Sequence, residues 1–188
     1  IVMNVNNSVY LLTAGEYERC YKLDNNTKQW YQAPTFGLFL AGYQYLFSYG
    51  EKIYSGLAPG FDFNGHYFFS INPENDSRQE LATFPGLATS NQVSFVLGDK
   101  GYVISGHTNF NSAQIWEYNF ATDEWTNKGN SPLGKRNEAC VFVANNKVYM
   151  GLGYVLITLN GQTIKQYKKD WIEYIPGSAY GIAKADFP

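Results

Sequence analysis

The 188-residue sequence predicts an all-β protein made of repeated four-stranded antiparallel sheets, and three observations lead to this prediction. Aromatic residues form 18% of the chain and charged residues only 16%, and aromatic side chains favour pleated sheet surfaces. Eighteen glycines and seven prolines interrupt the chain at short intervals. No segment keeps the 3.6-residue apolar period of a helix, whereas strand-like hairpin patterns recur along the whole chain.

One hairpin pattern occurs four times. In residues 141–153 an apolar strand is followed by a polar turn and a second apolar strand, and the same pattern recurs at 5–15, 47–56 and 95–106. A short polar turn between two apolar runs is typical of a β-hairpin. When the turns are aligned, a tyrosine falls at one position of the second strand in every copy: Tyr10, Tyr54, Tyr102 and Tyr149. The first strands likewise align Met3, Phe47, Phe95 and Phe142.

A second hairpin follows each of these. Residues 21–30 and 116–125 share an aromatic start, a polar turn and a closing tryptophan, whereas 69–80 and 172–181 fit this pattern less well. A proline closes each repeat, at Pro34, Pro85, Pro132 and Pro188. The sequence therefore predicts four sheets, here called blades, with strands a to d in chain order. Their expected bounds are about 1–34, 35–85, 86–132 and 133–188.

These blades are expected to stack, because a single four-stranded sheet cannot bury both of its faces alone. Four-stranded units of this length stacked around an axis form a β-propeller. The recurrent tyrosines, with Trp30 and Trp125, are expected in the packing between blades. Cys20 and Cys140 lie far apart in strand-like segments, so we expect two buried thiols and no disulfide framework.

The repeats resemble kelch repeats. The resemblance lies in the tyrosine and glycine of strand b and in the segment IWEYNFATDEW at 115–125. The doubled glycine of that family is incomplete here, and tryptophan occupies the strand-d position only at Trp30 and Trp125. Kelch propellers usually close with about six or seven blades, so the resemblance implies that four blades are part of a larger ring. A closed four-bladed ring and an eight-bladed ring of two chains are the alternatives, and unpaired blade edges would need missing blades, self-association or a partner.

Function in a propeller is expected in the loops at one mouth of the channel, which are the b–c and d–a connections. These segments contain Tyr, Phe, Asn and Gln with few charges, a mixture that suits stacking on sugar rings or contact with a peptide. The b–c loops are expected at 15–19, 57–66, 107–112 and 154–169, and the d–a connections at 35–42, 86–92 and 133–138. The predicted ligand-binding residues are Arg136, Glu138, Tyr17, Arg19, His66, His107, Asn91 and Gln92.

Arg136 and Glu138 stand just before the last strand a. The resemblance to kelch propellers implies that an arginine here contacts ligand, and the alternative is a structural pair between Arg136 and Glu138 that ties adjacent blades. The aligned positions in other blades are uncharged, which favours a functional role over a scaffold role.

Metal and cofactor chemistry is not predicted. His66 and His107 are the only histidines, and a metal site normally needs three or four ligands. Phosphate-binding glycine loops, nucleophile elbows and zinc motifs do not occur in the sequence.

Composition also limits the partners. The net charge is −2 and no basic cluster suggests nucleic acid; Lys165, Lys168 and Lys169, the densest group, are interpreted as a solvated edge. No apolar run approaches the ~20 residues that span a bilayer. The composition resembles that of secreted, periplasmic or cell-surface bacterial proteins. We therefore expect a non-catalytic binding module for a glycan or a protein. A sugar mutarotase or epimerase of the kelch type, with Glu138 as acid–base residue, is the alternative.

Overall fold

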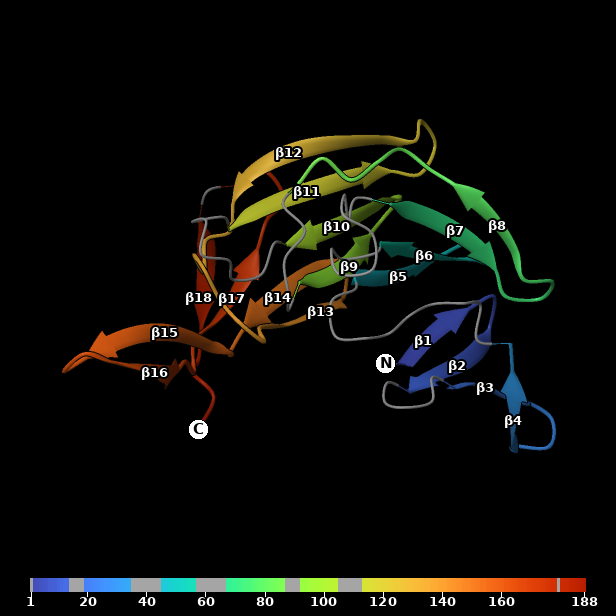
Figure 1. The fold of residues 1–188 in the computed structure, drawn as a ribbon, viewed down its shortest axis with the longest axis horizontal. Helices are drawn as coiled ribbons and strands as arrows, with labels where there is room; N and C mark the ends of the chain where they lie inside the picture. The colour runs from blue at the N-terminus through green and yellow to red at the C-terminus, as the bar shows by residue number, and fades with distance from the viewer. Residues whose placement is uncertain are drawn as a thin grey trace. The chain divides into compact units, whose positions relative to one another are not determined.

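The computed structural model describes residues 2–13, 19–34, 45–56, 67–86, 92–104, 113–178 and 180–188. Every regular element in these ranges is a β-strand, as the sequence predicts (Figure 1). The described residues include no helix long and apolar enough to cross a membrane. The chain divides into two compact units, Ile1–Phe84 and Pro85–Pro188.

The first unit contains two antiparallel sheets, each with its four strands in chain order. The first blade consists of β1 (Val2–Val5), β2 (Ser8–Thr13), β3 (Arg19–Leu23) and β4 (Trp30–Ala33). The second blade consists of β5 (Tyr45–Tyr49), β6 (Lys52–Gly56), β7 (Phe68–Asn72) and β8 (Ser77–Glu80). The Glu74 carboxylate, in the turn after β7, ties the two blades because it accepts hydrogen bonds from the Tyr10 hydroxyl at 3.0 Å and the Lys22 ammonium at 2.6 Å.

The second unit contains two further four-stranded sheets and one additional hairpin. The third blade consists of β9 (Val93–Leu97), β10 (Lys100–Ile104), β11 (Gln114–Asn119) and β12 (Glu124–Asn130). The fourth blade consists of β13 (Cys140–Ala144), β14 (Lys147–Gly151), β17 (Trp171–Tyr174) and β18 (Gly181–Lys184). Four meandering four-stranded sheets are the blades of a β-propeller fold, which confirms the predicted fold class.

The additional hairpin corrects the prediction of a loop at 154–169. Strands β15 (Tyr154–Leu159) and β16 (Gln162–Tyr167) pair in this segment and form a sheet of their own between β14 and β17. The turn between them is Asn160-Gly161, with φ of 51° and 78°. Both values are positive, as a two-residue type I′ turn requires, and Asn-Gly is its preferred sequence.

Local turn chemistry explains why the repeats are regular. The a–b turns of the first and fourth blades use Asn pairs with positive φ, Asn6-Asn7 and Asn145-Asn146, because asparagine tolerates the left-handed region better than most residues. The c–d turns of the first three blades start with an Asx residue whose side chain accepts a backbone hydrogen bond two residues on. These are Asp24, Asn72 and Asn119.

Burial confirms most of the predicted packing but not all of it. Tyr10, Tyr54 and Tyr102 are buried, and Tyr149 is half-buried. The prediction for Trp30 is wrong: its side chain, on β4, is 47% exposed. Trp125 is half-buried and its ring centroid lies 4.9 Å from that of Tyr118.

The two cysteines differ. Cys20 is fully buried, and burial raises the pKa of its thiol to about 11. Cys140 is exposed at the start of β13, so the expectation of two buried thiols holds only for Cys20.

Candidate binding site

Most of the described part of the predicted loop face lies in the fourth blade. It comprises the d–a connection at 131–139 and the base of the β15–β16 hairpin, residues 152–154 and 165–170, and we call it the blade-4 corner. Of the predicted ligand-binding residues, Arg136 and Glu138 lie in it. Tyr17, His66, His107 and Asn91 lie outside the described residues.

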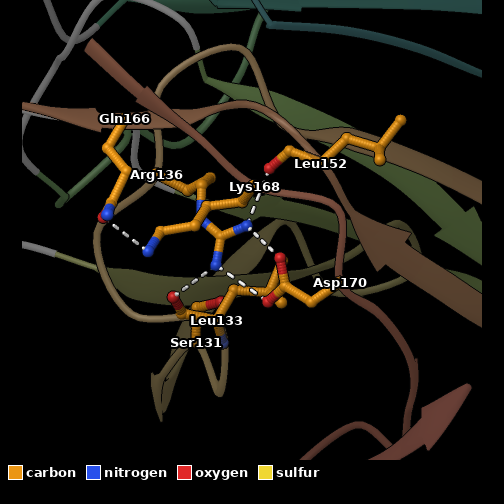
Figure 2. A network of polar contacts seen from close by, with 7 residues as sticks. All are labelled: Ser131, Leu133, Arg136, Leu152, Gln166, Lys168 and Asp170. Atoms are coloured by element: carbon orange, nitrogen blue, oxygen red, sulfur yellow. Dashed lines mark hydrogen bonds and ion pairs between the residues drawn. The ribbon is translucent and has the colours of Figure 1, made fainter. Parts of the chain in front are cut away.

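Arg136 is the central charge of the blade-4 corner, and only 8% of it is exposed. Its Nη1 donates to Asp170 Oδ1 at 2.8 Å and to the Leu152 carbonyl at 2.8 Å, and its Nη2 donates to Asp170 Oδ2 at 3.0 Å and the Leu133 carbonyl at 3.4 Å. Figure 2 shows the guanidinium between the Asp170 carboxylate and these carbonyls. A bidentate arginine–carboxylate pair fixes both partners geometrically. Arg136 therefore joins the d–a connection to both ends of the inserted hairpin.

The ion pair with Arg136 also changes the pKa of Asp170. The Arg136 guanidinium, through its hydrogen bonds, holds the pKa of the Asp170 carboxyl below its ordinary value, and partial burial opposes this effect. Asp170, and not Glu138, is the acid that pairs with Arg136, so the predicted pair between Arg136 and Glu138 is not formed.

A small pocket adjoins this network. The apolar side chains of Val93, Ile104 and Met150 line it together with Ser131 and Arg136, and its ≈ 10 Å³ of space for the centre of a water molecule is about the minimum that one water needs. Within the described part of the chain, the Nε of Arg136 is buried without a hydrogen-bond partner. A buried N–H of this kind is suited to a single acceptor of water size.

Glu138 lies at the surface of the blade-4 corner. It is exposed, and its φ of 51° is unusual for a residue other than glycine. The neighbouring Gly153 makes this backbone path possible: a Cβ at Gly153 would lie 2.2 Å from the Asn137 carbonyl oxygen and 2.9 Å from the Glu138 carbonyl carbon. Close backbone approach, and not only turn formation, therefore requires glycine at this position.

The base of the hairpin carries the aromatic side chains of the corner. Asn137 and Tyr154 exchange two backbone hydrogen bonds of 2.9 Å. The Tyr154 ring contacts that of Tyr167, with 5.8 Å between centroids, and the Lys165 ammonium lies 4.1 Å from the Tyr154 centroid. Contact with Tyr154 raises the pKa of Lys165, and the negative charge of Glu138 contributes less strongly in the same direction.

The other two described candidates lie elsewhere. Arg19 is exposed at the start of β3, where its Nη1 lies 3.4 Å from the Tyr21 hydroxyl, and this contact raises the pKa of Arg19. Gln92 is half-buried directly before β9. Sequence reasoning missed Asp170, Tyr154 and Tyr167; the Asn160-Gly161 dipeptide was the signal for the hairpin that places them.

Metal ligands do not gather in the described ranges, where no group of three or more His, Cys, Asp or Glu side chains is placed to hold an ion. The two histidines lie outside these ranges.

Comparison with known proteins supports the fold alone. No family model matches the sequence, and no curated protein is similar to it. Among solved structures, the fold is similar to the structure of YjhT, with a TM-score of 0.60 and 15% sequence identity. The match covers 78% of this chain and 51% of that chain, so this chain spans about half the length of the structure it matches. The resemblance to kelch repeats stays a prediction, and the structure places the chain among proteins of the β-propeller fold.

Proposed function

We propose that this chain is a non-catalytic binding module that holds a glycan or a protein at the b–c and d–a connections. The observation that supports it best is that Arg136 forms an ion pair with Asp170 and donates hydrogen bonds to two backbone carbonyls. Such a network holds the blade-4 corner in one geometry. Glu138, Lys165 and Tyr167 are exposed to solvent around this network. A rigid base with exposed polar and aromatic side chains is typical of binding surfaces.

The enzymatic alternative requires Glu138 to act as acid–base residue beside Arg136. A general acid or base usually lies in a cleft, within hydrogen-bond reach of the reacting group. Glu138 is exposed, and the Arg136 guanidinium donates its hydrogen bonds to other acceptors. This environment favours a contact role for Glu138 over proton transfer.

The test uses the full chain on an array of immobilised oligosaccharides and synthetic peptides. We expect Glu138→Ala and Tyr17→Ala to weaken retention about tenfold, as loss of interface anchors does, with unchanged thermal unfolding. Glu124→Ala is the matched control, because Glu124 is an exposed acid on the outermost strand of the third blade.

Two results would contradict this proposal. Retention that falls equally in the control variant, or turnover of a free sialic acid that Glu138→Gln abolishes, would contradict a non-catalytic binding role.

A further inference from the structure

The β15–β16 hairpin is a two-stranded sheet that extends from the fourth blade (Figure 1). All six residues of β16 are exposed, and so are the large side chains of Leu159, at 56%, and Tyr167, at 70%. Within the described part of the chain, its only backbone pairing to another segment of regular structure is the bridge between Tyr154 and Asn137. Because isolated two-stranded hairpins are marginally stable in water, a further strand on this sheet would stabilise it.

The register shows which backbone groups are available. The two-residue turn makes Leu159 and Gln162 a hydrogen-bonded pair, and hydrogen-bonded and non-hydrogen-bonded pairs then alternate along the hairpin. On this pattern Tyr154 and Tyr167 form a non-hydrogen-bonded pair, so the N–H and C=O of Tyr154 point away from β16. The structure agrees, because both groups of Tyr154 form hydrogen bonds with Asn137. By the same alternation, the N–H groups of Thr163, Lys165 and Tyr167 point to the outer edge of β16.

The charged residues of the hairpin segment are all basic; the acids of the blade-4 corner are Glu138, whose charge acts on Lys165, and Asp170, which pairs with Arg136. Residues 154–169 contain Lys165, Lys168 and Lys169 and no aspartate or glutamate. A strand that pairs with β16 would lie beside these lysines, and opposite charges across a strand pair are stabilising. A second copy of the hairpin would instead bring two sets of three lysines together, which is unfavourable.

We propose that the edge of β16 binds an extended, acidic segment of a partner protein by strand addition. The proposal rests on the proposed binding function and specifies a protein as the ligand. Backbone hydrogen bonds to the three outward N–H groups would supply affinity, and the lysines with Tyr167 would select acidic and apolar side chains.

Proline substitution tests the edge directly. The probe is a fluorescent eight-residue peptide of alternating glutamate and valine, titrated against the full chain by anisotropy. Thr163→Pro removes an outward N–H of β16 without breaking a bond within the hairpin, and we expect at least about tenfold weaker binding. Thr158→Pro is the matched control, because Thr158 is the cross-strand partner of Thr163 and its N–H points to the opposite edge.

Charge reversal gives a second test that does not depend on proline. Lys165→Glu with Lys168→Glu should weaken binding of the acidic peptide and strengthen binding of an alternating lysine–valine peptide. Lys52→Glu, in β6 of the first unit, should change neither.

Three outcomes would overturn the proposal. They are equal effects of Thr158→Pro and Thr163→Pro, no difference between acidic and basic peptides, and a concentration-dependent dimer that Thr163→Pro dissociates. Glycan retention that depends on Glu138, without any peptide binding, would refute strand addition and leave the binding function intact. Absence of both kinds of binding would refute both.

Discussion

Asp170 accepts two parallel hydrogen bonds from Arg136, although the two residues are 34 positions apart in the chain. Between them lie strands β13 and β14 and the whole β15–β16 hairpin. The pair therefore connects the entry to the fourth blade with the return from its inserted hairpin. It joins the two segments that carry Glu138, Lys165 and Tyr167.

Removal of the acid should destabilise the second unit. Asp170→Asn keeps one acceptor but leaves a buried guanidinium without its countercharge, and we expect a loss of about 1 to 2 kcal/mol in the free energy of unfolding. The loss is smaller than for a fully buried pair because Asp170 is partly exposed and water screens its charge. Urea unfolding measures it. Glu124→Gln, an exposed acid-to-amide change, should have almost no effect, and an equally stable Asp170→Asn protein would contradict the role given to the pair.

The same pair predicts a dependence on acidic pH. The folded state lowers the pKa of Asp170, so its contribution to stability is complete above the unfolded value, about 3.9, and is lost as pH falls through the folded pKa. The stability difference between the wild type and Asp170→Asn should therefore be constant near neutral pH and shrink below about pH 4. Urea midpoints of both proteins between neutral pH and pH 3 test this. A stability difference that grows as pH falls would contradict the prediction.

The sequence predicts the fold well because its signals are local. Turn residues such as Asn6, Asn145 and Asp24 determine where strands end, so strand positions follow from short segments. The partner of Arg136 cannot be read from a short segment, because the β15–β16 hairpin lies between Arg136 and Asp170 in the chain. The exposure of Trp30 depends in turn on what covers the outermost strand β4, and no repeat pattern contains that information.

A buried tyrosine of the third blade offers a prediction about the repeated strand-b position. The Tyr102 hydroxyl donates to Glu117 at 2.6 Å across the β10–β11 pair, and Lys128 lies 3.6 Å from the same carboxylate. Burial, followed by this acidic neighbour, raises the pKa of Tyr102.

Tyr102→Phe should cost about 1 to 2 kcal/mol in the free energy of unfolding, since it removes a hydrogen bond to a charged group. Thermal unfolding measures it. Tyr31→Phe, at an exposed position on β4, is the control with little expected change. Equal midpoints for both variants would mean that the Tyr102 hydroxyl does not stabilise the blade.

The last prediction separates two reasons for glycine at the hairpin. Gly153 and Gly161 have almost the same φ, 76° and 78°, but a Cβ at Gly153 would collide with the Asn137 carbonyl, whereas one at Gly161 would meet nothing within 4 Å. Gly161→Ala should therefore show only the backbone cost of a positive φ, about 1 kcal/mol. Gly153→Ala adds the steric clash and should cost about 2 kcal/mol or more. It should also loosen the Asn137–Tyr154 bridge, and hydrogen exchange at the Tyr154 N–H reports this. If both variants lose the same stability and leave that exchange rate unchanged, the close approach between Gly153 and the d–a connection does not hold the hairpin in place.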